Sequence, residues 1–459
     1  MYTLDFKKPI HVHFIGIGGI SMSGLAEILL KENFTISGSD AKKSALTEHL
    51  EALGAQIFYG QRASNIIEGI ELVVYTAAIH EDNPEFACAV SKGIPMISRA
   101  DLLGQIMKNY ELPIAVAGTH GKTTTTSMAS HILMEGGFDP TISVGGILPS
   151  IGGNLRVGNS GTFITEACEY TNSYLSFFPK ISIILNIDAD HLDFFKDIDD
   201  IRQSFRKFAQ LLPEDGTLII NSDTPCYETV IADLPCEVIT YSLEHDADYT
   251  AEDIHFNEFG HASFTCKHKG EVVGTFKLSV PGVHNVSNAL SVVALGMKLN
   301  MNLEDLQKGI CKFTGTDRRF QHKGTIAGVN IIDDYAHHPT EIKATLTSAQ
   351  NYPHKKLWCV FQPHTYTRTA ALLPEFAEAL ALADHVILAD IYAAREINTL
   401  GISSEDLQKL IQEKGTACDY FPSFGEIEDH LLENCVSGDM VITMGAGDVV
   451  KIGEHLLGL

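Results

Sequence analysis

The stretch Ile114-Ala-Val-Ala-Gly-Thr-His-Gly-Lys-Thr-Thr-Thr-Thr-Ser127 decides the fold of the central part of the chain. A short apolar run ends in a turn of small residues, and a helix-forming run begins at once after the turn. This order of strand, loop and helix places backbone N–H groups at a helix start, where they can bind phosphate. Lys122 can reach the β- and γ-phosphates, and Thr123 can offer a hydroxyl to Mg²⁺. The residues predicted to bind ATP here are Gly118, Thr119, His120, Gly121, Lys122, Thr123 and Thr124.

The loop departs from the usual phosphate-loop pattern of Gly-x-x-x-x-Gly-Lys followed by Ser or Thr. Val116 stands where the first glycine belongs, and Gly118 comes two residues later. A glycine-rich turn before a threonine-capped helix would account for the tripeptide Gly-Lys-Thr alone. The strand, loop and helix together favour nucleotide binding over that structural interpretation.

On both sides of this loop, short apolar runs alternate with helical spacing, which predicts parallel βαβ units. The first unit runs from a strand at 10–15 to about residue 108. The central unit contains the phosphate loop and a β-rich part at 237–280, and the last unit starts near residue 323. The sequence therefore predicts an α/β protein with three tandem domains, at 1–108, 109–322 and 323–459, and ligands in the clefts between them.

Composition excludes several classes of function. The 459 residues include 58 acidic and 33 basic ones, giving a net charge of −25, which disfavours nucleic-acid binding. No apolar stretch approaches about 18 residues, so no membrane span is expected, and the first residues show no cleavage signal. The nine cysteines are scattered without a Cys-x-x-Cys pair, which predicts reduced thiols in a cytoplasmic protein.

A second glycine-rich loop follows the first predicted strand and opens a helix. It contains Gly16, Gly18, Gly19 and Ser21, and Asp40 ends the next strand about twenty residues later. The loop resembles a dinucleotide fingerprint, although Ser21 replaces its third glycine. A diphosphate can bind such a loop whether it belongs to NAD or to a UDP-sugar, so this motif alone leaves a dehydrogenase and a nucleotide-sugar enzyme open.

Two further segments carry candidate ligands. Glu166 follows the strand at 162–165 and is placed to bind Mg²⁺. His191 lies in an acidic turn after the strand at 181–185, where a surface histidine is the simpler interpretation because Mg²⁺ prefers oxygen. Asn285 and Asn288 share one face of a helix start, and they can either cap the helix or bind a base edge.

Taken together, these motifs resemble the Mur ligases, the ATP-dependent amide-forming enzymes of bacterial peptidoglycan synthesis. Six segments keep the order found in that family along the whole chain. They are Gly-Thr-His-Gly-Lys-Thr at 118–123, Glu-Ala-Cys-Glu at 166–169, Asn-Ile-Asp-Ala-Asp-His at 186–191, His-Asn-Val-Ser-Asn at 284–288, Arg-Arg-Phe-Gln at 318–321 and Asp-Asp-Tyr-Ala-His-His-Pro at 333–339.

The resemblance implies a Rossmann-like N-terminal domain for a UDP-sugar, a P-loop ATPase centre and a Rossmann-like C-terminal domain for an amino acid. The glycine loop at 15–24, the segments at 75–79 and 83–85 and Pro-His-Thr-Tyr-Thr-Arg at 363–368 point to members that join L-alanine to the lactyl carboxylate of UDP-N-acetylmuramate through an acyl phosphate. The family resemblance also implies that the protein is a monomer or a weak homodimer. Thr365 stands where some members place an arginine in the amino-acid pocket.

The resemblance assigns residues to each ligand. Lys122, Glu166 and His191 are the expected catalytic residues, and Thr123, Glu166 and His191 are the expected metal ligands. The family resemblance thus favours a metal-binding role for His191 over that of a surface histidine. ATP is further expected at Asn285, Asn288, Arg319 and Asp334. The UDP-sugar is expected at Gly16, Gly18, Gly19, Ser21, Asp40, Thr76, Ala77, Arg99 and His120. The amino acid is expected at Tyr335, His337, His364 and Arg368.

Three alternatives remain open at this point. A ligase that attaches a preformed tripeptide to the same UDP-sugar would share the first two domains and differ in the C-terminal pocket. An NAD-dependent oxidoreductase would leave Lys122 and its loop without a use. A non-catalytic regulator would not need Lys122, Glu166 and His191. The sequence does not separate L-alanine from glycine or L-serine, because one methyl group gives only about 1–3 kcal/mol of discrimination.

Overall fold

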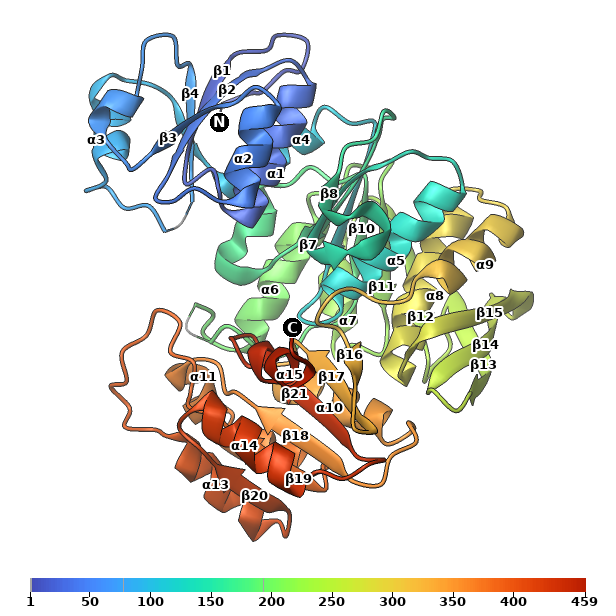
Figure 1. The fold of residues 1–459 in the computed structure, drawn as a ribbon. Coiled ribbons are helices and arrows are strands. Elements are labelled where there is room, and N and C mark those ends of the chain that lie inside the picture. Colours follow the sequence, from blue (N-terminus) through green and yellow to red (C-terminus); the bar gives the residue numbers. More distant parts are fainter. Residues whose placement is uncertain (1, 77, 193) are drawn as a thin grey trace.

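A computed structural model describes residues 2–76, 78–192 and 194–459 of the chain, and Figure 1 shows three α/β bodies in sequence order. The N-terminal body is a parallel sheet with strand order β3-β2-β1-β4-β5. Its strands are β1 (His11–Ile15), β2 (Thr35–Asp40), β3 (Gln56–Tyr59), β4 (Leu72–Tyr75) and β5 (Met96–Ser98). Its helices are α1 (Ile20–Lys31), α2 (Ala45–Ala52), α3 (Pro84–Ser91) and α4 (Arg99–Met107), with a 3₁₀ turn at η1 (Ala63–Asn65).

The central body is a ten-stranded sheet with order β15-β14-β13-β12-β11-β10-β6-β9-β7-β8. Its strands are β6 (Leu112–Ala117), β7 (Thr141–Leu148), β8 (Gly153–Arg156), β9 (Thr162–Ala167), β10 (Ile181–Ile184), β11 (Thr217–Asn221), β12 (Glu237–Ser242), β13 (Tyr249–Phe256), β14 (His261–His268) and β15 (Glu271–Pro281). Its helical segments are α5 (Lys122–Glu135), η2 (Pro149–Ile151), η3 (Tyr170–Ser176), α6 (Ile198–Ala209), α7 (Tyr227–Ile231), α8 (Val283–Lys298) and α9 (Leu303–Lys312). Strands β9, β6 and β10 run parallel, so the loops after them share one edge of the sheet.

The C-terminal body is a six-stranded sheet with order β16-β17-β21-β18-β19-β20. Its strands are β16 (Gln321–Ile326), β17 (Val329–Asp334), β18 (Leu357–Phe361), β19 (His385–Leu388), β20 (Ala417–Tyr420) and β21 (Met440–Met444). Its helices are α10 (Pro339–Ala349), α11 (Tyr366–Ala371), α12 (Leu373–Leu380), α13 (Ser404–Glu413), α14 (Phe424–Asn434) and α15 (Val450–Leu457). All neighbouring strands except the β16–β17 pair are parallel.

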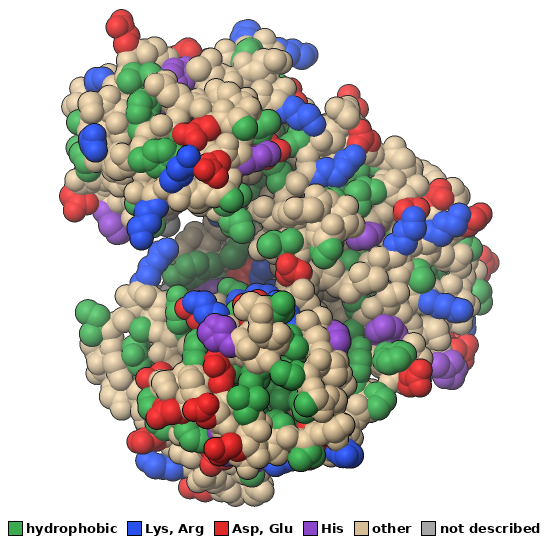
Figure 2. Space-filling view, in the orientation of Figure 1, with side chains coloured by type: hydrophobic (Ala, Val, Ile, Leu, Met, Phe, Trp, Pro, Cys, Tyr) green, Lys and Arg blue, Asp and Glu red, His purple; other side chains and the backbone are tan. Residues whose placement is uncertain are grey.

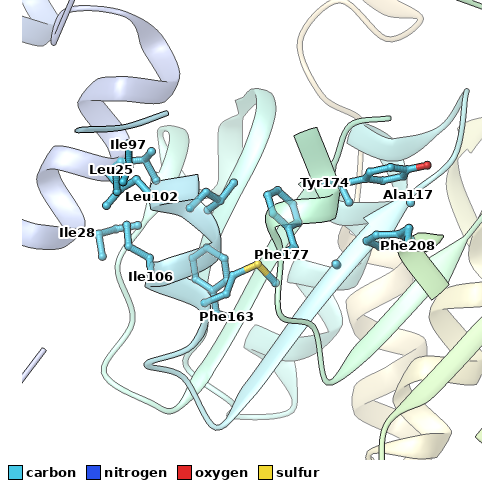
Figure 3. Close-up of a cluster of buried hydrophobic side chains, with 14 of the residues drawn as sticks. Leu25, Ile28, Ile97, Leu102, Ile106, Ala117, Phe163, Tyr174, Phe177 and Phe208 are labelled. Carbon is cyan, nitrogen blue, oxygen red and sulfur yellow. The ribbon is translucent and has the colours of Figure 1, made fainter. Parts of the chain in front are cut away.

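The N-terminal and central bodies share one hydrophobic core. Apolar side chains of α1 and α4 continue into those of β9, η3 and α6, as Figure 3 shows. The approach is close at Gly104 of α4, where an added Cβ would lie 1.9 Å from the carbonyl oxygen of Ser176. A side chain at this position would therefore force α4 away from η3.

The structure confirms the predicted α/β class and the three-part order. Strand β4 covers the predicted residues 72–75, and β17, β18 and β21 match their predictions to within a residue. The hairpin of β7 and β8 and the antiparallel edge strand β16 were not predicted. The boundaries at 108 and 322 remain a proposal. All nine cysteines are free, and no helix among the described residues has the length and apolar character that a membrane crossing needs.

Candidate functional site

The phosphate loop joins β6 to α5, and two glycines give it its shape. Gly118 has a φ of +148° and Gly121, which caps α5, has a φ of +83°. Both values favour glycine, since other residues rarely adopt them. A Cβ at Gly121 would also lie 3.0 Å from Oδ1 of Asn288, so this turn packs directly against α8.

Lys122 is the first residue of α5, and its ammonium group is held from several sides. It donates hydrogen bonds to the carbonyl oxygens of Gly118 and Thr119 and pairs with Glu169 at 2.9 Å. The Glu169 side chain is only 3% exposed. Burial alone would lower the pKa of Lys122, but Glu169 and its neighbours raise it above its ordinary value. Lys122 is therefore a fixed, fully charged cation at the mouth of the loop.

Oxygen ligands suitable for a magnesium ion lie beside Lys122. Thr123 donates its hydroxyl hydrogen to Oε2 of Glu166 at 3.1 Å, and Oε1 of Glu166 accepts the N–H of Gly145. Hydroxyl and carboxylate oxygens are what Mg²⁺ prefers, so this pair fits the ion chemically. His191 lies on the same side of the sheet, with Nε2 3.9 Å from Oε1 of Glu169.

His120, inside the phosphate loop, connects the central and C-terminal bodies. Its ring nitrogens lie 3.3 Å from Oδ2 of Asp188 and 3.2 Å from Oε1 of Glu341 in α10. Burial alone would lower the pKa of His120, but hydrogen bonds to the two carboxylates outweigh it and raise the pKa to about 9. The imidazole is therefore protonated at neutral pH and acts as a cation between two anions.

The contact between these bodies extends beyond His120. Thr340 donates its hydroxyl hydrogen to Asp188 at 2.7 Å, and His338 bonds the carbonyl oxygen of Ala189 at 3.2 Å. His338 also caps α10, because its Nδ1 accepts the N–H of Thr340. The residues around Asp188 thus hold the start of α10 against the phosphate loop.

A cavity of about 420 Å³ lies between the central and C-terminal bodies. It brings together part of the predicted ATP set, namely His120, Gly121, Thr124, Asn285, Asn288, Arg319 and Asp334. The amide of Asn285 donates to the carbonyl oxygen of Pro281 at 2.7 Å, and Asn288 donates to Oδ1 of Asn285 at 3.0 Å. Lys122, Thr123 and Thr119 lie next to this cavity along the loop.

Asp334 and Arg319 form the C-terminal side of the same cavity. The carboxylate of Asp334 accepts the N–H groups of Phe320 and Ala336, both at 2.8 Å. Burial raises its pKa to about 6. Arg319 lies 3.9 Å from Glu341 and over the ring of Tyr335. The segment that follows α9 is thus tied to β17 of the C-terminal sheet.

The four residues predicted for the amino acid form a continuous series. The rings of Tyr335 and His337 have centroids 5.5 Å apart, and those of His337 and His364 are 5.7 Å apart. Arg368 lies 3.3 Å from Nδ1 of His364 and pairs with Asp190 of the central body at 2.8 Å. Burial would raise the pKa of Asp190, but Arg368 and nearby histidines outweigh it and hold the pKa well below its usual range.

A second cavity, of about 990 Å³, opens beside this series. His364 and Arg368 line it, whereas Tyr335 and His337 do not. Its central-body wall contains Asp190 and His191. The candidate metal ligand His191 and two of the four candidate amino-acid residues, His364 and Arg368, therefore face one space.

The residues predicted for the UDP-sugar lie mainly at the carboxyl edge of the N-terminal sheet. Asp40, at the end of β2, accepts the N–H of Gly18 at 2.8 Å, and Gly16 has a φ of +85°. Gly19 caps α1, and Ser21 is exposed in its first turn. Thr76 follows β4 and Arg99 follows β5, so parallel strands bring both to this edge. Ala77 lies outside the described residues.

Burial lowers the pKa of the Arg99 guanidinium, and Cys168 of the central body opposes this shift. The hollow between the N-terminal and C-terminal bodies is visible in Figure 2, with Lys and Arg side chains on its rim. His120 lies on the side of the C-terminal body, with its ring turned to Glu341. The structure thus places His120 in the wall of the cavity between the central and C-terminal bodies.

Sequence reasoning gave no role to four carboxylates that the structure places in the site. Glu169 binds Lys122, Asp188 and Glu341 bind His120, and Asp190 binds Arg368. Three of them lie inside motifs that carry the family resemblance, at 166–169 and 186–191, so their position was a signal. Glu341 lies outside those motifs, and only the tertiary structure reveals it.

A phosphate loop that holds a charged, half-buried lysine, together with two cavities between the central and C-terminal bodies, is typical of an ATP-using ligase of three α/β parts. Three family models match in order: "Mur ligase family, catalytic domain" at residues 11–111, "Mur ligase middle domain" at 116–296 and "Mur ligase, glutamate ligase domain" at 318–447. The chain belongs to the Mur ligase family.

Among similar proteins is the UDP-N-acetylmuramate–L-alanine ligase of Agathobacter rectalis, 63% identical over 457 residues, with all of both chains covered. The protein of the same name from Lachnospira eligens is 58% identical, again over the whole of both chains. Among solved structures, the UDP-N-acetylmuramate–alanine ligase MurC of Thermotoga maritima matches with a TM-score of 0.81 and 28% identity, covering 98% of each chain. A murein peptide ligase of Psychrobacter arcticus matches with a TM-score of 0.70 and 25% identity over 98% of each chain.

Proposed function

We propose that this enzyme joins L-alanine to the lactyl carboxylate of UDP-N-acetylmuramate with consumption of ATP, in the synthesis of the peptidoglycan precursor. The observation that carries the proposal is the placement of Lys122, Glu166 and His191 at or after the ends of neighbouring parallel strands, with His191 lining the same cavity as His364 and Arg368. Full-length relatives at 58–63% identity bear the name of this activity, which supports the same choice.

The reaction proceeds by carboxylate activation. The lactyl carboxylate attacks the γ-phosphate of ATP, giving an acyl phosphate and ADP, and the amine of L-alanine then displaces phosphate to form the amide. Two anions meet in the first step, so positive charge must be fixed at the meeting point. Lys122 supplies one such charge, because Glu169 and the loop carbonyls hold its ammonium group in place.

Thr123, Glu166 and His191 would hold Mg²⁺, which supplies further positive charge against the phosphates when it is bound. Asn285 and Asn288 would bind the adenine edge, and Arg319 and Asp334 would contact the nucleotide from the C-terminal side of its cavity. The contact of His120 with Glu341 holds α10 over the loop. Such closure excludes water, which would otherwise hydrolyse the acyl phosphate.

The substrates would occupy the two remaining parts of the site. The diphosphate of the UDP-sugar would lie at Gly16, Gly18, Gly19 and Ser21, with Asp40, Thr76, Ala77 and Arg99 around it. The position of His120 makes it a contact for the nucleotide phosphates or for the sugar end next to them. Tyr335, His337, His364 and Arg368 would surround L-alanine, with Arg368 facing its carboxylate. The enzyme would act in the cytoplasm as a monomer or weak homodimer.

Phosphate release with UDP-N-acetylmuramate, ATP and Mg²⁺ tests the proposal. L-alanine, glycine, L-serine and a preformed tripeptide would be compared at equal concentrations. We expect release with L-alanine and formation of the UDP-N-acetylmuramoyl-alanine product by mass spectrometry. Release with the tripeptide alone would replace the proposal by the tripeptide ligase, and ATP consumption without any amine acceptor would reject a ligase altogether.

A further inference from the structure

The larger cavity contains a second arginine, Arg395, besides Arg368. Arg395 is exposed, and among the described residues no side chain or backbone group forms a hydrogen bond or ion pair with it. Arg368 differs, because both its Nε and its Nη2 donate to one oxygen of Asp190, at 3.2 and 2.8 Å. The free guanidinium in this cavity is therefore that of Arg395.

The fold brings Arg395 to the same edge as Arg368. Arg395 follows β19, and Arg368 follows β18, and these parallel neighbours end at one edge of the C-terminal sheet. Glu396 fixes the two loops together, since its carboxylate accepts the N–H groups of Tyr366 at 2.7 Å and Thr367 at 3.0 Å at the start of α11. Arg395 is thus held one residue from an anchored position.

Tyr392 anchors the other end of this loop. Its N–H donates to the carbonyl oxygen of Pro363 at 2.8 Å, its carbonyl oxygen accepts the N–H of Thr365 at 2.9 Å, and its ring stacks on His364. Arg395 therefore lies three positions after one fixed point, Tyr392, and directly before the other, Glu396. The backbone of Arg395 is therefore confined at this cavity, while its side chain has no bonded partner among the described residues.

The charges around the cavity show what Arg395 is able to bind. Asp190 neutralises Arg368, so this pair attracts an added anion only weakly. Glu396 already accepts three donors from Tyr366 and Thr367, and these bonds also occupy the N–H groups at the start of α11. A substrate carboxylate in this space finds one unpaired fork of donors, which is suited to bidentate binding.

We propose that Arg395 binds the carboxylate of the amino-acid substrate and shares this role with Arg368. The proposal deepens the proposed function and rests on it, because it requires a free amino acid in this cavity. Arg395 would approach from the solvent side and Arg368 from the Asp190 side. Selection for a free α-carboxylate, as opposed to an amide or an ester, would then depend mainly on Arg395.

Steady-state kinetics of Arg395→Ala, Arg395→Lys and Lys414→Ala test the proposal. Lys414 is a matched control, an exposed cation just after α13 that does not line the cavity. We expect Arg395→Ala to raise the KM for L-alanine by about 10- to 100-fold, the effect of losing a charge-assisted hydrogen bond. The KM values for ATP and the UDP-sugar should stay within about two-fold, and Arg395→Lys should recover part of the loss.

A second substrate separates a carboxylate contact from a structural role. L-Alaninamide lacks the carboxylate, so its kcat/KM, or its Ki as a competitor, should be nearly the same in wild type and Arg395→Ala. An unchanged KM for L-alanine, or equal losses for L-alanine and L-alaninamide, would overturn the proposal while leaving the ligase activity in place. Wild-type enzyme that releases no phosphate with L-alanine would instead refute the proposed function, and this inference with it.

Discussion

Raising the pH should weaken the contact that His120 makes between the phosphate loop and the C-terminal body. The ring lies 3.3 Å from Asp188 and 3.2 Å from Glu341, and its side chain is only 12% exposed. Burial opposes the charged form, but hydrogen bonds to both carboxylates outweigh it and raise the pKa from 6.5 to about 9. The folded protein therefore binds this proton more tightly than the unfolded chain does.

The size of the effect follows from this difference in pKa. Because the folded value lies above the unfolded one, the stabilisation is fully present below pH 6.5 and is lost as the pH rises to about 9. A gap of about 2.5 units corresponds to about 3 kcal/mol of unfolding free energy. About 2 kcal/mol of it should remain at pH 7.5, and almost none at pH 10.

Chemical unfolding of wild type and His120→Asn at intervals between pH 6 and pH 10 measures this contribution. The difference in unfolding free energy between the two proteins should shrink by about 3 kcal/mol across that range. His255→Asn, at an exposed histidine of β13, serves as the matched control and should show a constant difference from wild type. A His120→Asn difference that stays constant from pH 6 to pH 10 would refute the assignment of a protonated His120 between two carboxylates.

Three other substitutions test separate parts of the structure. Lys122→Ala should lower turnover by about 10²-fold or more while the circular dichroism spectrum stays unchanged, since it removes the fixed charge proposed to face the phosphates. Near-normal turnover would refute the proposed mechanism. Asn288→Ala should raise the KM for ATP by about ten-fold, whereas an unchanged KM would reduce Asn288 to a packing role. Gly104→Ala should lower the free energy of unfolding in urea by about 1–3 kcal/mol, because its methyl group would meet Ser176. The control Gly425→Ala adds a methyl group where α14 has open space, so it should be neutral or stabilising. Similar results for both variants would contradict the packing of α4 against η3.

Local patterns predicted the parts of the fold that depend on neighbouring residues. The strand, loop and helix around Lys122 could be predicted because an apolar run, a glycine turn and a helix-forming run follow each other in sequence. Buried strands such as β18 were readable for the same reason, since parallel strands covered on both faces are continuously apolar. The hairpin of β7 and β8 was missed because β7 contains two consecutive glycines and β8 is only four residues long.

The partners of the site residues could not be predicted in the same way. His120 and Glu341 are more than two hundred residues apart, and their contact depends on how two bodies dock. Arg368 and Asp190 are 178 residues apart, and their contact depends on the same docking. Family resemblance identified the candidate residues of each ligand, but it contains no statement of which carboxylate neutralises which cation. That information lies in the tertiary structure.

These carboxylates show how a chain with a net charge of −25 can bind several anions. Lys122 lies against Glu169, Arg368 against Asp190, and Arg319 near Glu341, so each of these three cations has a carboxylate within 4 Å, whereas Arg395 has none among the described residues. A buried cation without a partner costs several kcal/mol, which these pairs avoid. A substrate anion must then compete with the carboxylate, and its net gain is the difference between two ion pairs. Only a ligand that makes additional contacts, such as a triphosphate across the whole phosphate loop, wins that competition, so the pairing itself contributes to selectivity.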